Sequence, residues 1–164
     1  MSLPKYRLQP VLDSKEKRKN EAEKALAETR AELERQRNLL RTREEEVTRA
    51  IKKKDDTSAD LMKKMDRGME SEKITEGRAF IDVLKRNIEI ARKKADNQKK
   101  VVHQWEQKVE AALMKVTEAT KEMKVIEKHK ENWTEAEKKE IEIKEEKEQE
   151  EVAQNMYEQS RKRR

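Results

Sequence analysis

The chain contains no cysteine, and among its 164 residues only two are proline, two are glycine and five are aromatic. The absence of cysteine excludes a disulfide framework and thiol chemistry. Apolar residues make up 32% of the sequence, too little to fill a compact core, whereas charged residues make up 48%. Two classes of protein fit this composition, a disordered chain and a long exposed helix.

Long hydrophobic runs are also missing from the sequence. No run approaches the roughly 20 apolar residues that a helix needs to span a bilayer. The first ten residues, MSLPKYRLQP, lack the apolar core of a secretory signal. We therefore expect a cytoplasmic protein.

No arrangement of side chains typical of an active site is present in the sequence. There is no glycine-rich phosphate loop, and His103 and His129 stand alone among charged residues. We interpret both as ordinary exposed histidines. A paired-helix structure would also lack a pocket that excludes water. The sequence therefore predicts a protein that is not an enzyme and that carries no cofactor or metal.

The stretch after Gly77 carries a heptad repeat. Its track comprises Ile81, Leu84, Ile88, Ala91, Ala95, Gln98, Val102, Trp105, Val109, Ala112, Val116, Ala119, Met123, Ile126, Lys130 and Trp133. Only Gln98 and Lys130 on this track are polar. A period of 3.5 residues held over this length predicts a left-handed coiled-coil seam and excludes disorder.

A weaker stripe of apolar residues precedes this seam. It follows a period of seven through Leu12, Lys19, Leu26, Leu33, Leu40, Val47, Lys54 and Leu61. A companion track, which includes Lys15, Ala22 and Thr29, is mostly polar or small. This segment is therefore predicted to form another helix, the first along the chain, with one good row of core residues.

The two stripes are centred near residue 70, where both glycines lie, and this symmetry predicts an all-α fold. We expect a long antiparallel two-helix coiled-coil hairpin with an overhanging C-terminal helix end. It forms a single domain over 1–164, with helix 1 at about 8–67, a turn at about 68–76, helix 2 at about 77–158 and a basic tail at 159–164. Gly68 is expected to end the first helix, and Ser71 or Thr75 to cap the second.

The C-terminal part of the second helix has no partner in this hairpin. Residues 134–160 contain ten acidic residues and four lysines, a net charge of −6, and the chain ends in the basic run RKRR at 161–164. Nucleic acid or a membrane surface could contact such a run. Because it is short and lacks aromatics, we favour a solubilising end or a contact for an acidic partner.

Phe80 is expected beside the turn, close to a group of flexible apolar side chains. These are Met62, Met65, Met69 and Ile74. Two interpretations remain open for Phe80, an adaptable binding surface or a cover over the last core layer.

Two stretches of the chain resemble a known family. The start KYRLQPVL at residues 5–12 precedes a charged helix, and residues 127–154 contain HKENW and EEKEQEE. These motifs are similar to those of the FliJ/YscO family of bacterial type III export, and they are nearer the virulence-secretion YscO-type branch than flagellar FliJ.

The resemblance implies a function as a central stalk. Members of this family form a two-helix coiled coil similar to part of the γ subunit of rotary ATP synthases. The open end, which carries both termini, enters the hexameric export ATPase, the turn end reaches the export gate membrane protein, and secretion chaperones are further partners. A monomer at the inner-membrane base of the secretion apparatus is implied.

The resemblance also assigns candidate binding residues to each end. Contacts with the ATPase are implied for Tyr6, Arg7, Gln9 and Trp133. Contacts with the export gate are implied for Phe80 and Leu84, an aromatic residue and a leucine one helical turn apart.

The main alternative is a generic coiled-coil scaffold or adaptor that self-associates through the leucine track of the first helix. A hairpin like those of prefoldin subunits would require strands, and the sequence shows no strand-like alternation. A nucleic-acid binder would show a steep dependence of binding on salt.

Overall fold

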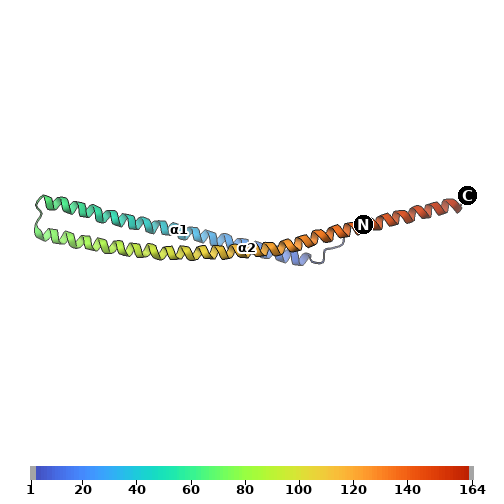
Figure 1. The fold of residues 1–164 in the computed structure, drawn as a ribbon, viewed down its shortest axis with the longest axis horizontal. Helices are drawn as coiled ribbons and strands as arrows, with labels where there is room; N and C mark the ends of the chain where they lie inside the picture. Colours follow the sequence, from blue (N-terminus) through green and yellow to red (C-terminus); the bar gives the residue numbers. More distant parts are fainter. Residues whose placement is uncertain (1–2, 163–164) are drawn as a thin grey trace. The chain divides into compact units, whose positions relative to one another are not determined.

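The structure, a computed structural model, describes residues 3–162 and contains two helices. Helix α1 spans Gln9–Asp66 and helix α2 spans Ser71–Lys162. Figure 1 shows the two helices joined by a short turn. The predicted all-α helical hairpin is confirmed. Neither helix offers, within the described residues, a stretch apolar enough to span a bilayer.

The start of the second helix differs from the expected position. We expected it near residue 77, but α2 begins at Ser71 and includes Gly77. Gly77 allows a close approach of the helices: a Cβ atom added there would lie 2.6 Å from Leu61 Cδ1. Gly77 therefore lies inside the helix as a packing position, because any larger residue there would force the Leu61 side chain to move.

The expected capping residues of α2 are corrected by the structure. Thr75 lies inside the helix, where its hydroxyl donates to the carbonyl oxygen of Ser71 at 3.1 Å. Ser71 is itself the first helical residue, and the carbonyl of Glu70 accepts the N–H of Ile74 at 3.1 Å. Glu70 therefore occupies the capping position, one residue before Ser71.

The other helix bounds lie close to the predicted ones. Helix α1 starts at Gln9, with Pro10 in its first turn, where a missing N–H leaves no bond unmade. Helix α2 continues to residue 162, so the first part of the predicted basic tail is helical, while 163–164 lie outside the described residues.

Gly68 ends α1 in the manner predicted. Its φ is +89°, in the left-handed region, and its N–H donates to the carbonyl of Met65 at 3.0 Å. An L side chain in this conformation brings Cβ close to the following carbonyl oxygen, whereas glycine has no Cβ. The turn therefore requires glycine at this position.

Replacement of Gly68 by alanine should destabilise the protein. We expect Gly68→Ala to lower the free energy of unfolding by about 1 kcal/mol, because the Cβ atom of alanine is strained against the backbone in the left-handed conformation. Gly68→Asn should cost less, since asparagine tolerates this conformation better. Urea denaturation followed by circular dichroism measures both. Equal stability of Gly68→Ala and the wild type would contradict the strain argument.

Contacts divide the chain into two compact units, which are described separately. Unit 1 contains Met1–Glu23 and Lys115–Arg164, and unit 2 contains Lys24–Met114. The organisation of 1–164 as a single domain remains a prediction of the sequence.

In unit 2 the predicted seam is buried. Six of its side chains are the most deeply buried in this unit: Leu26, Leu33, Leu84, Ile88, Ala95 and Val102. One polar layer interrupts them, where the Gln98 amide donates to Gln36 Oε1 at 2.8 Å and to the Gln36 carbonyl at 3.2 Å. A polar pair in an apolar seam favours one register over its shifted alternatives.

Ion pairs flank the seam of unit 2. Arg37 contacts Glu106 at 2.9 Å, and Lys99 contacts Glu44 at 3.6 Å. The hydrogen bond from Arg37 lowers the pKa of Glu106. Such exposed pairs contribute little to stability, so burial of the seam is the main stabilising term.

In unit 1 the N-terminal part of α1 packs against the middle of α2. Leu12, Met123 and Ile126 are half-buried there. Lys15 reaches across to Glu122 at 2.7 Å, and its hydrogen bond lowers the pKa of this carboxyl. From residue 146 to 159 every side chain of α2 is exposed.

The leucine track of α1 is packed within the chain. Leu12 is half-buried in unit 1, and Leu26 and Leu33 are buried in unit 2. The scaffold alternative would use this track for self-association, but most of it already contacts α2.

Candidate functional surfaces

An aromatic cluster occupies the N-terminal end of unit 1. Tyr6 is only 9% exposed. The centroid of its ring lies 5.1 Å from the ring centroid of Trp133 and 5.8 Å from that of His129. The Tyr6 hydroxyl and His129 Nδ1 form a hydrogen bond of 2.7 Å. His129 and Trp133 are four residues apart, so both face Tyr6 from the same side of α2.

His129 is exposed, as predicted, but it does not stand alone. Its ring packs against Tyr6 and hydrogen-bonds to it. Sequence reasoning missed it because the partner is 123 residues away along the chain. Its spacing of four from Trp133 was the available signal.

A groove beside this cluster brings together all four residues expected to contact the ATPase. Tyr6, Arg7, Gln9 and Trp133 line an open space of about 610 Å³ together with Leu3, Pro4, Lys5, Pro10, Lys130 and Thr134. Lys130 donates to Gln9 Oε1 at 2.8 Å, which holds the first turn of α1 against α2. The groove thus combines aromatic rings with basic and amide groups.

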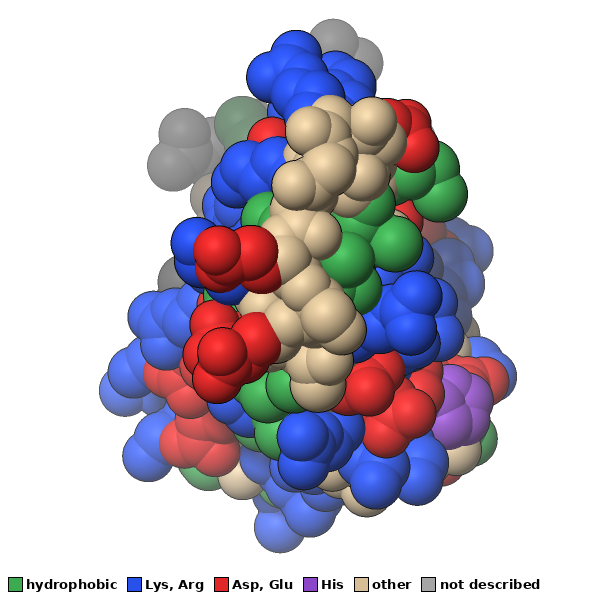
Figure 2. Space-filling view, turned by 90° about the vertical axis from the view of Figure 1, so that its left-hand side faces the viewer, with side chains coloured by type: hydrophobic (Ala, Val, Ile, Leu, Met, Phe, Trp, Pro, Cys, Tyr) green, Lys and Arg blue, Asp and Glu red, His purple; other side chains and the backbone are tan. Residues whose placement is uncertain are grey.

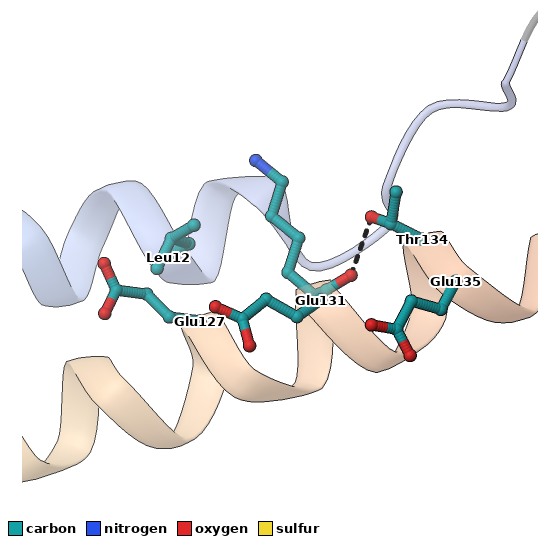
Figure 3. A pocket seen from close by; sticks show the side chains of 6 residues that line it. Leu12, Glu127, Glu131, Thr134 and Glu135 are labelled. Atoms are coloured by element: carbon teal, nitrogen blue, oxygen red, sulfur yellow. Dashed lines mark hydrogen bonds between the residues drawn. The ribbon is translucent and has the colours of Figure 1, made fainter.

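An acidic edge lies next to the groove in the same unit. Figure 3 shows Glu127, Glu131 and Glu135 in a row along α2, with Leu12 of α1 facing them. Thr134 Oγ1 donates to the carbonyl of Lys130 at 2.7 Å, the bond drawn as a dashed line. Lys128 pairs with Glu131 at 2.9 Å, which raises the pKa of Lys128. Glutamates one turn apart offer negative charge to an approaching cationic partner.

At the turn end of unit 2, the two residues expected to contact the export gate differ in their exposure to solvent. Phe80 is 47% exposed, whereas Leu84 is 5% exposed and belongs to the seam. Leu84 is therefore a core residue, and an intact hairpin leaves little of its side chain available to a partner. The exposed apolar neighbour of Phe80 is Val83, at 41%. Sequence reasoning overlooked Val83 because the motif pairs the aromatic residue with a leucine, and the leucine near Phe80 lies four residues after it, whereas Val83 lies three after it.

Of the two interpretations of Phe80, its exposure favours the binding surface. Met62, also near the turn, is 66% exposed, while Met65, Met69 and Ile74 are half-buried. Figure 2, which faces the turn, shows hydrophobic side chains between basic and acidic ones on this end. Flexible apolar side chains on a surface suit contact with another protein.

A metal site is not formed by the residues that the structure describes. Among residues 3–162 no group of three or more His, Cys, Asp or Glu side chains is placed to hold an ion. The groove of unit 1 and the turn end of unit 2 each present apolar side chains together with charged ones.

Comparison with known proteins identifies the family. The profile of the YscO-like protein family matches residues 3–163. Among solved structures, CT670 from Chlamydia trachomatis, described as a candidate YscO homologue, is 30% identical with a TM-score of 0.82, over 99% of this chain and 100% of that one. The comparison with curated proteins finds no match. The chain belongs to the YscO-like family.

Proposed function

We propose that this type III secretion-related protein is the non-enzymatic central stalk of the export ATPase. Its open end binds inside the ATPase hexamer, and its turn end contacts the export gate membrane protein. Secretion chaperones are further partners in this proposal. The assignment places the protein in the cytoplasm, at the inner-membrane base of the secretion apparatus.

One observation carries the proposal. The four residues implied by family resemblance for ATPase contact, which are scattered between positions 6 and 133, line a single groove in unit 1. Beyond this groove α2 continues as an exposed acidic helix. A shaft that must enter a ring needs such an end, because charged contacts steer binding and give modest affinity without a permanent bond.

The turn end provides the test of the second contact. We expect Phe80→Ala, alone or with Val83→Ala, to leave the helicity unchanged and to weaken binding to the export gate about tenfold, since each removes an exposed apolar contact. Circular dichroism and a pull-down with the purified gate protein measure the two effects. Val125→Ala is the matched control, because Val125 is an exposed apolar residue of α2 in unit 1. Unchanged gate binding by both variants would reject this contact.

A further inference from the structure

A stripe of uncharged side chains runs along the outer side of α2 in unit 2. Phe80, Val83, Asn87 and Ile90 follow spacings of three, four and three residues, so they share one face of the helix. All four are exposed, and Ile90 is 54% exposed. The seam residue Leu84 lies on a different face. We call these four residues the outer stripe.

A row of basic residues borders the outer stripe. Arg86, Lys93 and Lys100 are exposed and recur every seven residues. Arg86 lies three residues after Val83 and four before Ile90, and Lys93 lies three after Ile90, so these two side chains are direct neighbours of the stripe on the helix surface. Lys100 continues the same row one heptad beyond the stripe. We call these three residues the basic row.

Three carboxylates of α2 lie within one turn of the basic row, those of Asp82, Glu89 and Asp96, and none forms a salt bridge with it. Asp82 pairs with Lys85 at 3.2 Å, and Asp96 lies 4.0 Å from Lys99. Arg86 instead donates from Nε to the backbone carbonyl of Asp82 at 3.4 Å. Among the described residues no carboxylate pairs with the basic row, so its charge is directed to solvent.

We propose that the outer stripe and the basic row together bind an acidic amphipathic helix of a partner protein. The stripe repeats with the period of a coiled-coil seam, so it suits the apolar face of another helix. The basic row lies where the flanking residues of that helix would pass, so it selects carboxylates there and disfavours lysine or arginine. This inference rests on the proposed function, since it names the chemistry that the turn end recognises in its partner.

A designed peptide tests the recognition without the secretion apparatus. The probe is an amphipathic helix of about three heptads with leucine on its apolar face and glutamate on its flanks. We expect it to bind the full-length protein, and Arg86→Glu with Lys93→Glu and Lys100→Glu to weaken binding at least about tenfold. Raised salt should weaken wild-type binding but strengthen the residual binding of the triple variant, because it screens the repulsion between the introduced glutamates and those of the peptide. Unchanged peptide affinity in the triple variant would overturn the inference.

A matched control separates this effect from a change in net charge. Lys17, Lys24 and Arg41 are exposed basic residues of α1, and their replacement by glutamate changes the charge by the same amount. This control should bind the peptide like the wild type. An equal loss in the control would overturn the inference, because the effect would then come from overall charge.

The export gate distinguishes failure of this inference from failure of the proposed function. If Phe80→Ala weakens gate binding and the triple variant does not, the gate contact stands and the acidic partner is wrong. If the peptide result holds but the wild type does not bind the gate, the inference stands and the gate assignment fails.

Two other occupants of the same surface are tested with the triple variant. Sedimentation velocity of the wild type and the variant tests a second copy of this chain, whose own acidic helix would bind. Flotation with phosphatidylglycerol vesicles tests an anionic membrane. Self-association or vesicle binding that the triple variant abolishes would overturn the proposal of a partner protein.

Discussion

Leu84→Ala is expected to lower the free energy of unfolding by about 2–4 kcal/mol, the cost of removing a buried leucine and leaving a cavity. Leu84 is 5% exposed, among the lowest values in the protein, and it lies in the seam of unit 2 with Ile88. Phe80→Ala, four residues earlier, should change stability by about 1 kcal/mol or less, because Phe80 is half-exposed. Urea denaturation followed by circular dichroism measures both.

This pair of variants separates packing from binding. We expect Leu84→Ala to lose gate binding only in proportion to the loss of folded protein, and Phe80→Ala to lose gate binding while it remains folded. Leu84→Met is the conservative control, since a substitution that conserves volume usually costs less than about 1.5 kcal/mol. A stable Leu84→Ala variant that fails to bind the gate would show that Leu84 itself contributes to gate binding.

The heptad repeat predicted the seam because burial follows the period of the helix directly. Ile88, Ala95 and Val102 were placed on the track from spacing alone, and all three are buried. Gly68 was equally accessible to sequence reasoning, since a left-handed helix end favours glycine. These features depend on local chemistry that the sequence displays.

Features that depend on contacts between distant residues could not be predicted in the same way. The second helix was expected to begin near Gly77, but the role of this residue depends on the approach of Leu61 from the other helix. The pairing of His129 with Tyr6 needs the register of the two helices to be known to within one turn. A period of seven fixes which face is buried and leaves the partner across the seam open.

Tyr6→Ala should release the segment before α1 from α2. The buried ring contacts Trp133 and His129, and its hydroxyl adds a hydrogen bond of 2.7 Å. Loss of both contributions is expected to cost about 2–3 kcal/mol of local stability. The N–H groups of Val11 and Leu12 both donate to the carbonyl of Leu8 at 3.0 Å, so their hydrogen exchange should accelerate about thirtyfold or more.

Comparison with Tyr6→Phe apportions this effect. Tyr6→Phe keeps the ring and removes only the hydrogen bond, so it should cost about 1 kcal/mol and accelerate exchange about fivefold. If the groove around Tyr6 binds the export ATPase, Tyr6→Ala should weaken binding to the purified hexamer far more than Tyr6→Phe. Phe80→Ala, an aromatic truncation at the turn end, should leave ATPase binding unchanged. Equal ATPase affinity in all three variants would place the ATPase contact outside this groove, in the exposed acidic part of α2.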